Sequence, residues 1–438
     1  MVRFGKLAVA VILVALVAAA FAILFRGSLS VAVRMLGGSN IVAMITSLPL
    51  WARVALPAAG GLGAGLIGLW STRLRRGSGV GFVMEAIVLG RVRIPLARSM
   101  LQAVASWLAI ATGNSLGREG PLIQFGAAAG EGARRWMKLP DAHAPLVLAA
   151  GVAAGFAAAY NAPIAGTLFV LEVVTGVVVL EAAIPAMIAA VIATVVVHQV
   201  IGAAPIYTTR TFAFVDPVEL VAYAVLGAIA APIGVGFLRL LSRADGWWKK
   251  LPLPSRPAIG GALCGAFLCV LPSVAGNGFE EVTGILDGRL AVTAVVILLI
   301  AKPLATAASV GSGNPGGVFT PTLLIGACVG LLYATGLHQV FGDAIAAPGS
   351  YVLVGLAAAL AATTHAPLMS AVLACELSGD FQLVLPLLVA CAIASGVARH
   401  LYIDSVYTAE LTRRGLRWRL TLDGRRVVES QQNSTDVV

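Results

Sequence analysis

Three short glycine-containing turns carry the residues of this chain that could perform chemistry. They read GSG at residues 77–79, GREGP at 117–121 and GGVFTP at 316–321. Each turn precedes an apolar segment, and a helix that begins at such a turn leaves backbone N–H groups unpaired, with about half a positive charge at its start. Helix starts of this kind bind anions. The three turns therefore predict an anion site built largely from backbone amides.

Glu119, within GREGP, adds a titratable group to this predicted site. Only 11% of the residues are Asp, Glu, Lys or Arg, so a glutamate between apolar segments needs an explanation. When ionised, its carboxylate can occupy the anion site, and when protonated it can leave, because an anion and a carboxylate satisfy the same amides. The alternative is a charge at an exposed helix end, but the repeated glycine and proline frame does not require a glutamate.

The composition indicates that membrane helices position these turns. Hydrophobic residues make up 59% of the chain and the mean hydropathy is +0.94, well above the values of soluble domains. Segments 7–24 and 291–301 contain no charged residue. The 49 glycines and 21 prolines interrupt the apolar runs, which predicts an all-α polytopic membrane protein with broken and re-entrant helices.

The net charge of +10 resides in basic clusters between the apolar segments. The clusters are Arg73, Arg75 and Arg76; Arg134, Arg135 and Lys138; Lys249 and Lys250; and Arg413, Arg414, Arg417 and Arg419. Basic loops between membrane helices follow the positive-inside rule, so this charge does not indicate nucleic-acid binding. It predicts a multi-pass protein of the inner (plasma) membrane with both termini in the cytoplasm.

The chain also repeats itself at a nearly constant separation. Gly117, Pro121, Gly151, Pro163 and Glu172 recur as Gly317, Pro321, Gly355, Pro367 and Glu376, and GSG at 77–79 aligns with GNG at 276–278. Internal duplication is typical of transporter folds, whose sites lie where broken helices meet near the membrane midplane. We expect membrane repeats at residues 1–210 and 211–404, inverted relative to each other so that the turns converge. Residues 405–438 would then form a final helix carrying Tyr407 and a cytoplasmic tail.

In order and spacing, these turns resemble the GSGIP, GREGP and GGxFxP motifs of the CLC family of chloride channels and chloride/proton antiporters. The segment from Asn161-Ala162-Pro163 to Glu172 is similar to the NAP stretch that precedes the family's inner glutamate. The resemblance covers nearly the whole chain and fits the bacterial type without regulatory domains. It implies two inverted helical repeats, a homodimer in the lipid bilayer with one anion path per subunit, chloride as the transported ion and no cofactor.

The resemblance also implies roles for individual residues. It places chloride-binding positions at Ser78, Gly79, Val318, Phe319 and Tyr407, and helix starts along the anion path at Gly77, Gly117, Arg118, Gly120 and Gly317. The hydroxyls of Ser78 and Tyr407 would contact the central chloride. Glu119 matches the external gating glutamate, and Arg118 beside it would raise the positive potential near the outer site.

Two departures from the family's motifs bear on function. Gly81 stands where GSGIP ends in proline, so the helix start after Ser78 loses a fixed φ. Val173 stands where the antiporters have their inner proton-transfer glutamate; valine cannot carry a proton, and channel members of the family have valine there. The recurrence of Glu172 as Glu376 favours a role in the fold, through buried hydrogen bonds, over a role in transport.

Several patterns can also be explained by a purely structural role or by a chance motif match. Ser78 could cap its own helix, and Tyr407 could be an interfacial aromatic. The GxSxG match at 113–117 would need a preceding strand and an α/β sheet to act as a nucleophile elbow, and neither is predicted. The histidines and cysteines have no metal-ligand spacing. We therefore expect neither an enzyme nor a metal site.

The sequence thus predicts CLC-type chloride transport gated by Glu119, passive and channel-like or weakly coupled to protons because of Val173. A chloride/proton antiporter with another proton route is the alternative, and a non-transporting membrane scaffold or sensor is more remote. Ser78 and Tyr407 favour chloride over nitrate, for which relatives carry proline at the serine position. They also favour chloride over fluoride, because the fluoride-selective branch lacks the tyrosine.

We expect Ser78→Pro to weaken chloride binding relative to nitrate, because the substitution removes a hydroxyl donor and a backbone N–H. The loss corresponds to one hydrogen bond to a charged group, about 1.5 to 3 kcal/mol at most. Calorimetric competition between the two anions measures the effect. An unchanged chloride-to-nitrate ratio would exclude Ser78 from the site.

Overall fold

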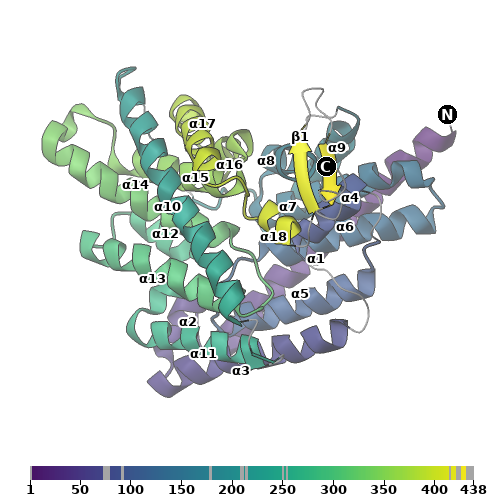
Figure 1. Ribbon diagram of the computed structural model, residues 1–438, viewed down its shortest axis with the longest axis horizontal. Helices are drawn as coiled ribbons and strands as arrows, with labels where there is room; N and C mark the ends of the chain where they lie inside the picture. Colours follow the sequence, from purple (N-terminus) through teal and green to yellow (C-terminus); the bar gives the residue numbers. More distant parts are fainter. Residues whose placement is uncertain are drawn as a thin grey trace, which may run out of the picture.

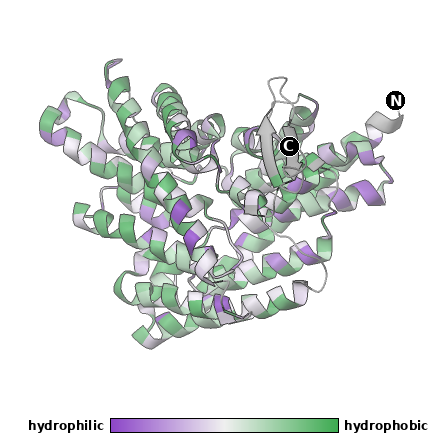
Figure 2. Ribbon diagram, viewed as in Figure 1, coloured by the Kyte–Doolittle hydropathy of each residue, from purple (hydrophilic) through white to green (hydrophobic). Residues whose placement is uncertain are grey.

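The chain is almost entirely helical, with long helices that cross one another at different tilts (Figure 1). The computed structural model describes residues 2–72, 79–89, 93–176, 180–207, 212, 216–248, 251–252, 255–413, 416–420 and 426–430. Within these residues, eight helices are long and apolar enough to cross a membrane. Figure 2 shows hydrophobic residues along most of their length. The predicted polytopic helical membrane protein is therefore confirmed.

The helices follow one another in a similar order in the two halves of the chain. The first half contains α1 (Val2–Met35), α2 (Ile41–Ser47), α3 (Leu50–Thr72), α4 (Val80–Leu89), α5 (Leu96–Ala111), α6 (Glu119–Trp136), η1 (Asp141–His143), α7 (Ala144–Tyr160), α8 (Pro163–Leu168), the π-helical η2 (Phe169–Thr175) and α9 (Leu180–Val200). The second half contains α10 (Glu219–Trp248), α11 (Ser255–Val270), η3 (Pro272–Val274), α12 (Phe279–Leu286), α13 (Val292–Gly311), α14 (Phe319–Phe341), η4 (Gly342–Ala344), α15 (Pro348–Thr364), α16 (Pro367–Ser378) and α17 (Val384–Leu401).

Reciprocal backbone pairing joins the two repeats at equivalent residues. The Gly117 N–H donates to the Gly317 carbonyl at 2.7 Å and the Gly317 N–H donates to the Gly117 carbonyl at 2.8 Å, which makes an isolated antiparallel bridge. Two equivalent segments can exchange identical bonds only when a two-fold rotation relates them. The two inverted repeats expected from the sequence are confirmed, while the boundaries near residues 210 and 404 stay predictions.

Glycines allow the central helices of each repeat to pack with their backbones in contact. A β-carbon on Gly126 of α6 would lie 2.0 Å from the carbonyl oxygen of Gly151 on α7. In the second repeat, a β-carbon on Gly326 of α14 would lie 2.4 Å from the carbonyl oxygen of Gly355 on α15. No side chain fits at these positions. The close packing holds the starts of α6 and α14 inside the protein.

Two glutamates cap helices of the opposite repeat. Glu376, on α16, accepts hydrogen bonds at the start of α8, and Glu172, in η2, accepts them at the start of α16. The donors to Glu376 are the backbone N–H groups of Ile164 (2.9 Å) and Ala165 (2.8 Å), and those to Glu172 are Leu368 (3.1 Å) and Met369 (2.6 Å). Each carboxylate thus accepts hydrogen bonds from two backbone N–H groups that have no acceptor within their own helix. Each also lies at the positive end of the helix that it caps.

The C-terminal segment differs from the expected final helix carrying Tyr407. Helix α18 (Thr408–Arg413) begins one residue after Tyr407. Tyr407 lies in a capping turn, in which the Ser405 hydroxyl accepts from the Thr408 N–H at 3.2 Å and the Thr408 hydroxyl accepts from the Ser405 N–H at 2.8 Å. An antiparallel hairpin of β1 (Leu416–Leu420) and β2 (Arg426–Ser430) follows, where the sequence predicted a tail.

Removing a cross-repeat cap should destabilise the fold. We expect Glu376→Ala to lower the free energy of unfolding by at least one hydrogen bond to a charged group, about 1.5 to 3 kcal/mol, because two amides at the start of α8 lose their acceptor. Thermal unfolding of the purified protein in detergent measures the change. Glu181→Ala is the matched control, because Glu181 is exposed at the start of α9. Equal melting temperatures for the two variants would contradict the capping role.

Candidate functional site

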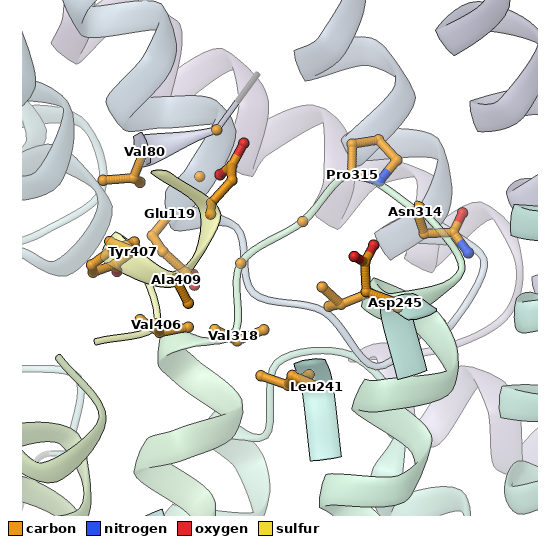
Figure 3. Close-up of a pocket in the computed structure, with 18 of the residues that line it drawn as sticks. Val80, Glu119, Leu241, Asp245, Asn314, Pro315, Val318, Val406, Tyr407 and Ala409 are labelled. Atoms are coloured by element: carbon orange, nitrogen blue, oxygen red, sulfur yellow. The ribbon is translucent and has the colours of Figure 1, made fainter. Parts of the chain in front are cut away.

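The helix starts predicted from the sequence meet at one cavity of about 540 Å³. Its lining includes Gly79 and Val80 at the start of α4, Glu119 and Gly120 at the start of α6, Gly316, Gly317 and Val318 before α14, and Tyr407 before α18. Figure 3 shows Glu119 and Tyr407 on one side of the cavity and Asp245 on the other. The cavity is therefore built by both repeats together with the C-terminal segment.

The Glu119 carboxylate lies at the start of α14, in the repeat opposite to its own. Its Oε1 accepts from the Phe319 N–H at 2.9 Å, and its Oε2 accepts from the Thr320 hydroxyl at 3.1 Å. The side chain is 1% exposed. A carboxylate on the first amide of a helix stands where a bound anion would stand, because the amides and the helix dipole attract either one.

Glycines on both sides leave room for this carboxylate. A β-carbon on Gly317 would lie 1.7 Å from Oε1 of Glu119, and one on Gly117 would lie 2.2 Å from Oε2. Both distances are far below van der Waals contact, so any side chain at either position would displace the carboxylate. The glycines that form the bridge between the repeats are thus also the walls of the Glu119 position.

A chain of hydroxyl groups extends from Glu119 to Tyr160 at the end of α7. Because the Thr320 hydroxyl donates to Glu119, it accepts its second hydrogen bond, at 3.1 Å, from the Tyr160 hydroxyl. Tyr160 is fully buried against the ring of Phe319. Sequence reasoning missed both residues. Thr320 lies inside the GGVFTP turn and Tyr160 directly precedes Asn161-Ala162-Pro163, so proximity to the motifs was the only available signal.

Gln124 connects the start of α4 to α6. Its Oε1 accepts from the Gly79 N–H at 2.9 Å, and Gly79 adopts a φ of +85° that favours glycine. Gln124 lies on the same helix as Glu119 and also lines the cavity. A buried glutamine in an apolar helix has no motif of its own, so the sequence did not indicate this role.

The remaining predicted residues occupy different surroundings. Arg118 places its guanidinium over the ring of Phe279, at the start of α12, 5.1 Å from the ring centroid. The rings of Tyr407 and Phe169 pack edge to face, with their centroids 5.8 Å apart. Val173 is 4% exposed and packs in the hydrophobic core. Gly77 and Ser78 lie outside the described residues.

Comparison with known proteins identifies relatives along most of the chain. A family model described as voltage gated chloride channel matches residues 60–399. The chain is 40% identical over 380 residues to a putative chloride channel protein ClcB-like of Ralstonia nicotianae (strain ATCC BAA-1114 / GMI1000), covering 85% of this chain and 89% of that protein. It is 35% identical over 374 residues to the voltage-gated ClC-type chloride channel ClcB of Escherichia coli O9:H4 (strain HS), covering 84% and 89%.

Solved structures share the fold. A slow cyanobacterial Cl-/H+ antiporter superposes with a TM-score of 0.82 at 26% identity, covering 93% of this chain and 98% of that one. A CLC-type fluoride/proton antiporter superposes with a TM-score of 0.78 at 23% identity, covering 92% and 97%. The second likeness concerns the fold alone.

Proposed function

Because the chain belongs to the voltage-gated chloride channel family, whose members are channels and transporters rather than enzymes, we propose that it carries chloride across the membrane through the cavity between its repeats. One observation carries the proposal: the Glu119 carboxylate accepts a hydrogen bond from the first backbone N–H of α14 at 2.9 Å. The chain thus places its own anion on a helix start that opens to a cavity. A transported anion would compete for the same amide.

In this proposal Glu119 is the gate. While ionised, it accepts hydrogen bonds from the Phe319 N–H and the Thr320 hydroxyl and blocks the anion path. Protonation removes its negative charge and weakens both hydrogen bonds, since charged acceptors bind about twice as strongly as neutral ones. Chloride can then replace the carboxylate. Acid should therefore increase the flux.

The proposed chloride-binding residues of the described chain lie around the same cavity as Glu119. Gly79, Val318 and Tyr407 line it, which supports the roles implied by the family resemblance. Phe319 would offer chloride the same backbone N–H that now donates to Glu119. Ser78 is proposed on its motif alone, because it lies outside the described residues. The family of the relatives supports chloride as the ion.

We propose that conduction is passive or only weakly coupled to protons. The position of the antiporters' inner glutamate holds Val173, which is buried in the core and has no titratable atom. Glu172, next to it, faces the start of α16, where its two oxygens accept hydrogen bonds from backbone N–H groups. Neither residue supplies a proton route toward Glu119.

A chloride/proton antiporter is the second candidate. The likeness to a slow Cl-/H+ antiporter favours it, and so do two further carboxylates in the cavity lining, Asp245 and Glu410. A proton could reach Glu119 through this cavity without passing Val173. The two candidates differ in whether proton movement has a fixed ratio to chloride movement.

The membrane arrangement is also a proposal. We place the protein in the inner (plasma) membrane with both termini in the cytoplasm, supported by the basic residues Arg134, Arg135 and Lys138 around the end of α6. Assembly as a homodimer with one anion path per subunit follows from the family resemblance. Cross-linking of the purified protein in lipid would test the dimer.

We expect Glu119→Gln to raise chloride efflux from liposomes at neutral pH and to abolish its increase in acid. The amide copies the protonated side chain and cannot compete as an anion for the Phe319 N–H. Efflux would be compared at about pH 4 and about pH 7.5, on the two sides of the reference pKa of a glutamate carboxyl, about 4.3.

Gly317→Ala is the companion variant, because its β-carbon would displace the carboxylate while leaving the charge in place. We expect it to raise the flux at neutral pH less than Glu119→Gln does. Retention of the wild-type pH response by Glu119→Gln would show that Glu119 is not the gate.

The mode of transport is tested by the reversal potential of the purified protein under opposed chloride and proton gradients. We expect it to lie near the chloride equilibrium potential, with little proton movement recorded by a pH electrode, because Val173 cannot relay protons. Uphill proton transport driven by chloride alone, and lost in Glu119→Gln, would instead establish the antiporter. Glu172→Gln should leave the reversal potential unchanged in either case.

A further inference from the structure

We propose that Glu410 is a second anion-competing carboxylate, which occupies the start of α4 as Glu119 occupies the start of α14. The inference rests on the proposed chloride transport and adds a residue to its path. Glu410 lies on α18, three residues after Tyr407, and lines the same cavity as Glu119. Chloride would reach the amides of α4 only when the Glu410 carboxylate is protonated or has moved away.

The first support is the position of the carboxylate against α4. A β-carbon on Gly81 would lie 3.0 Å from Oε2 of Glu410 and 3.4 Å from its Cδ, and one on Gly79 would lie 3.5 Å from Oε2. Helix α18 packs on α4. The first amides of α4 have no partner within the helix and carry its positive end, so a carboxylate here is stabilised as an anion would be.

The second support is the departure of the sequence at Gly81. The motif that this turn resembles has proline at this position, and the β-carbon of any such residue would press on the Glu410 carboxylate. Gly81 provides the space that Glu410 uses. The two residues form a pair: an unusual glycine at the start of α4 and a carboxylate from α18 that fills the room beside it.

The third support is the cavity itself. Ser106, on α5, is 1% exposed and lines the cavity, and its hydroxyl has no hydrogen-bond partner among the described residues. An unused donor in a cavity bordered by helix starts fits an anion that is not one of the chain's own groups. Glu410 is partly buried, so solvent can still exchange protons with it.

Other charged and titratable groups surround Glu410. Glu119, Asp245, Tyr402 and Tyr407 line the cavity, and α4 carries Glu85. Asp245 lies across the cavity from Glu119 and Tyr407 (Figure 3). Removing the charge of Asp245 therefore distinguishes a general effect of negative charge in the cavity from occupation of the α4 start by Glu410.

The test uses the full chain in planar bilayers, with the pH changed on one face at a time. Chloride currents of the wild type and Glu119→Gln first establish conduction. We then expect Glu410→Gln to raise the current several-fold at neutral pH and to remove the pH response of one face only, leaving the Glu119-dependent response of the other face. Asp245→Asn, which removes the same charge from the same cavity, should keep both responses.

Gly81→Ala supplies a second measurement that keeps Glu410 intact. Its β-carbon should push the carboxylate away from α4 by a few tenths of an ångström. We therefore expect part of the Glu410→Gln effect in the wild-type background and no added effect in a Glu410→Gln background. Additive effects would overturn the proposed contact. Unchanged pH responses in Glu410→Gln, equal effects of Asp245→Asn, or loss of chloride current in folded Glu410→Gln would overturn the proposal itself.

The outcomes separate this proposal from the proposed function. Absence of chloride current in both the wild type and Glu119→Gln would contradict chloride transport. Calorimetry with sodium chloride then still tests Glu410, because Glu410→Gln should bind chloride at least several-fold more tightly than the wild type if its carboxylate competes for the site. Equal affinities would overturn the inference without reference to transport.

Discussion

The pairing of Gly117 with Gly317 is the constraint on which the rest of the structure depends. The two backbone segments exchange hydrogen bonds of 2.7 and 2.8 Å, and they immediately precede α6 and α14. Because the segments are antiparallel and equivalent, the two helix starts face a common region from opposite repeats. Glu119, the first residue of α6, can then reach the first amide of α14.

Four helix starts in the described chain are each matched by a carboxylate from another element. Glu172 and Glu376 cap α16 and α8, and their oxygens hold two amides each. Glu119 and Glu410 lie at the starts of α14 and α4 and also line the cavity. The electrostatics is the same in all four cases. In our proposal an anion replaces the two carboxylates that line the cavity, whereas the other two hold the fold.

A buried cation is stabilised in the complementary way, by backbone carbonyl oxygens instead of backbone N–H groups. Lys302, on α13, is fully buried, and its Nζ donates to the carbonyl oxygens of Val274 and Gly276 at 2.9 Å each. The Gly276 carbonyl also accepts the Leu116 N–H. Lys302 thereby fixes the turn before α12 next to the segment that leads into Glu119. Burial of an ion is tolerated here because backbone dipoles replace its hydration.

The sequence by itself determined the membrane class, the duplication and the turns that form the cavity, because hydropathy, residue repeats and glycine placement are local properties of the chain. The family motifs pointed to Glu119, Tyr407 and Val173, the last at the position where the antiporters carry their inner glutamate. Only the tertiary structure decided which groups these residues meet. Three arrangements join segments far apart in the chain: the hydrogen bond from the Phe319 amide to Glu119, the caps that Glu172 and Glu376 place on the opposite repeat, and the position of the Glu410 carboxylate beside Gly81. No local pattern encodes such contacts, because they arise when inverted repeats bring helix starts of one half against side chains of the other.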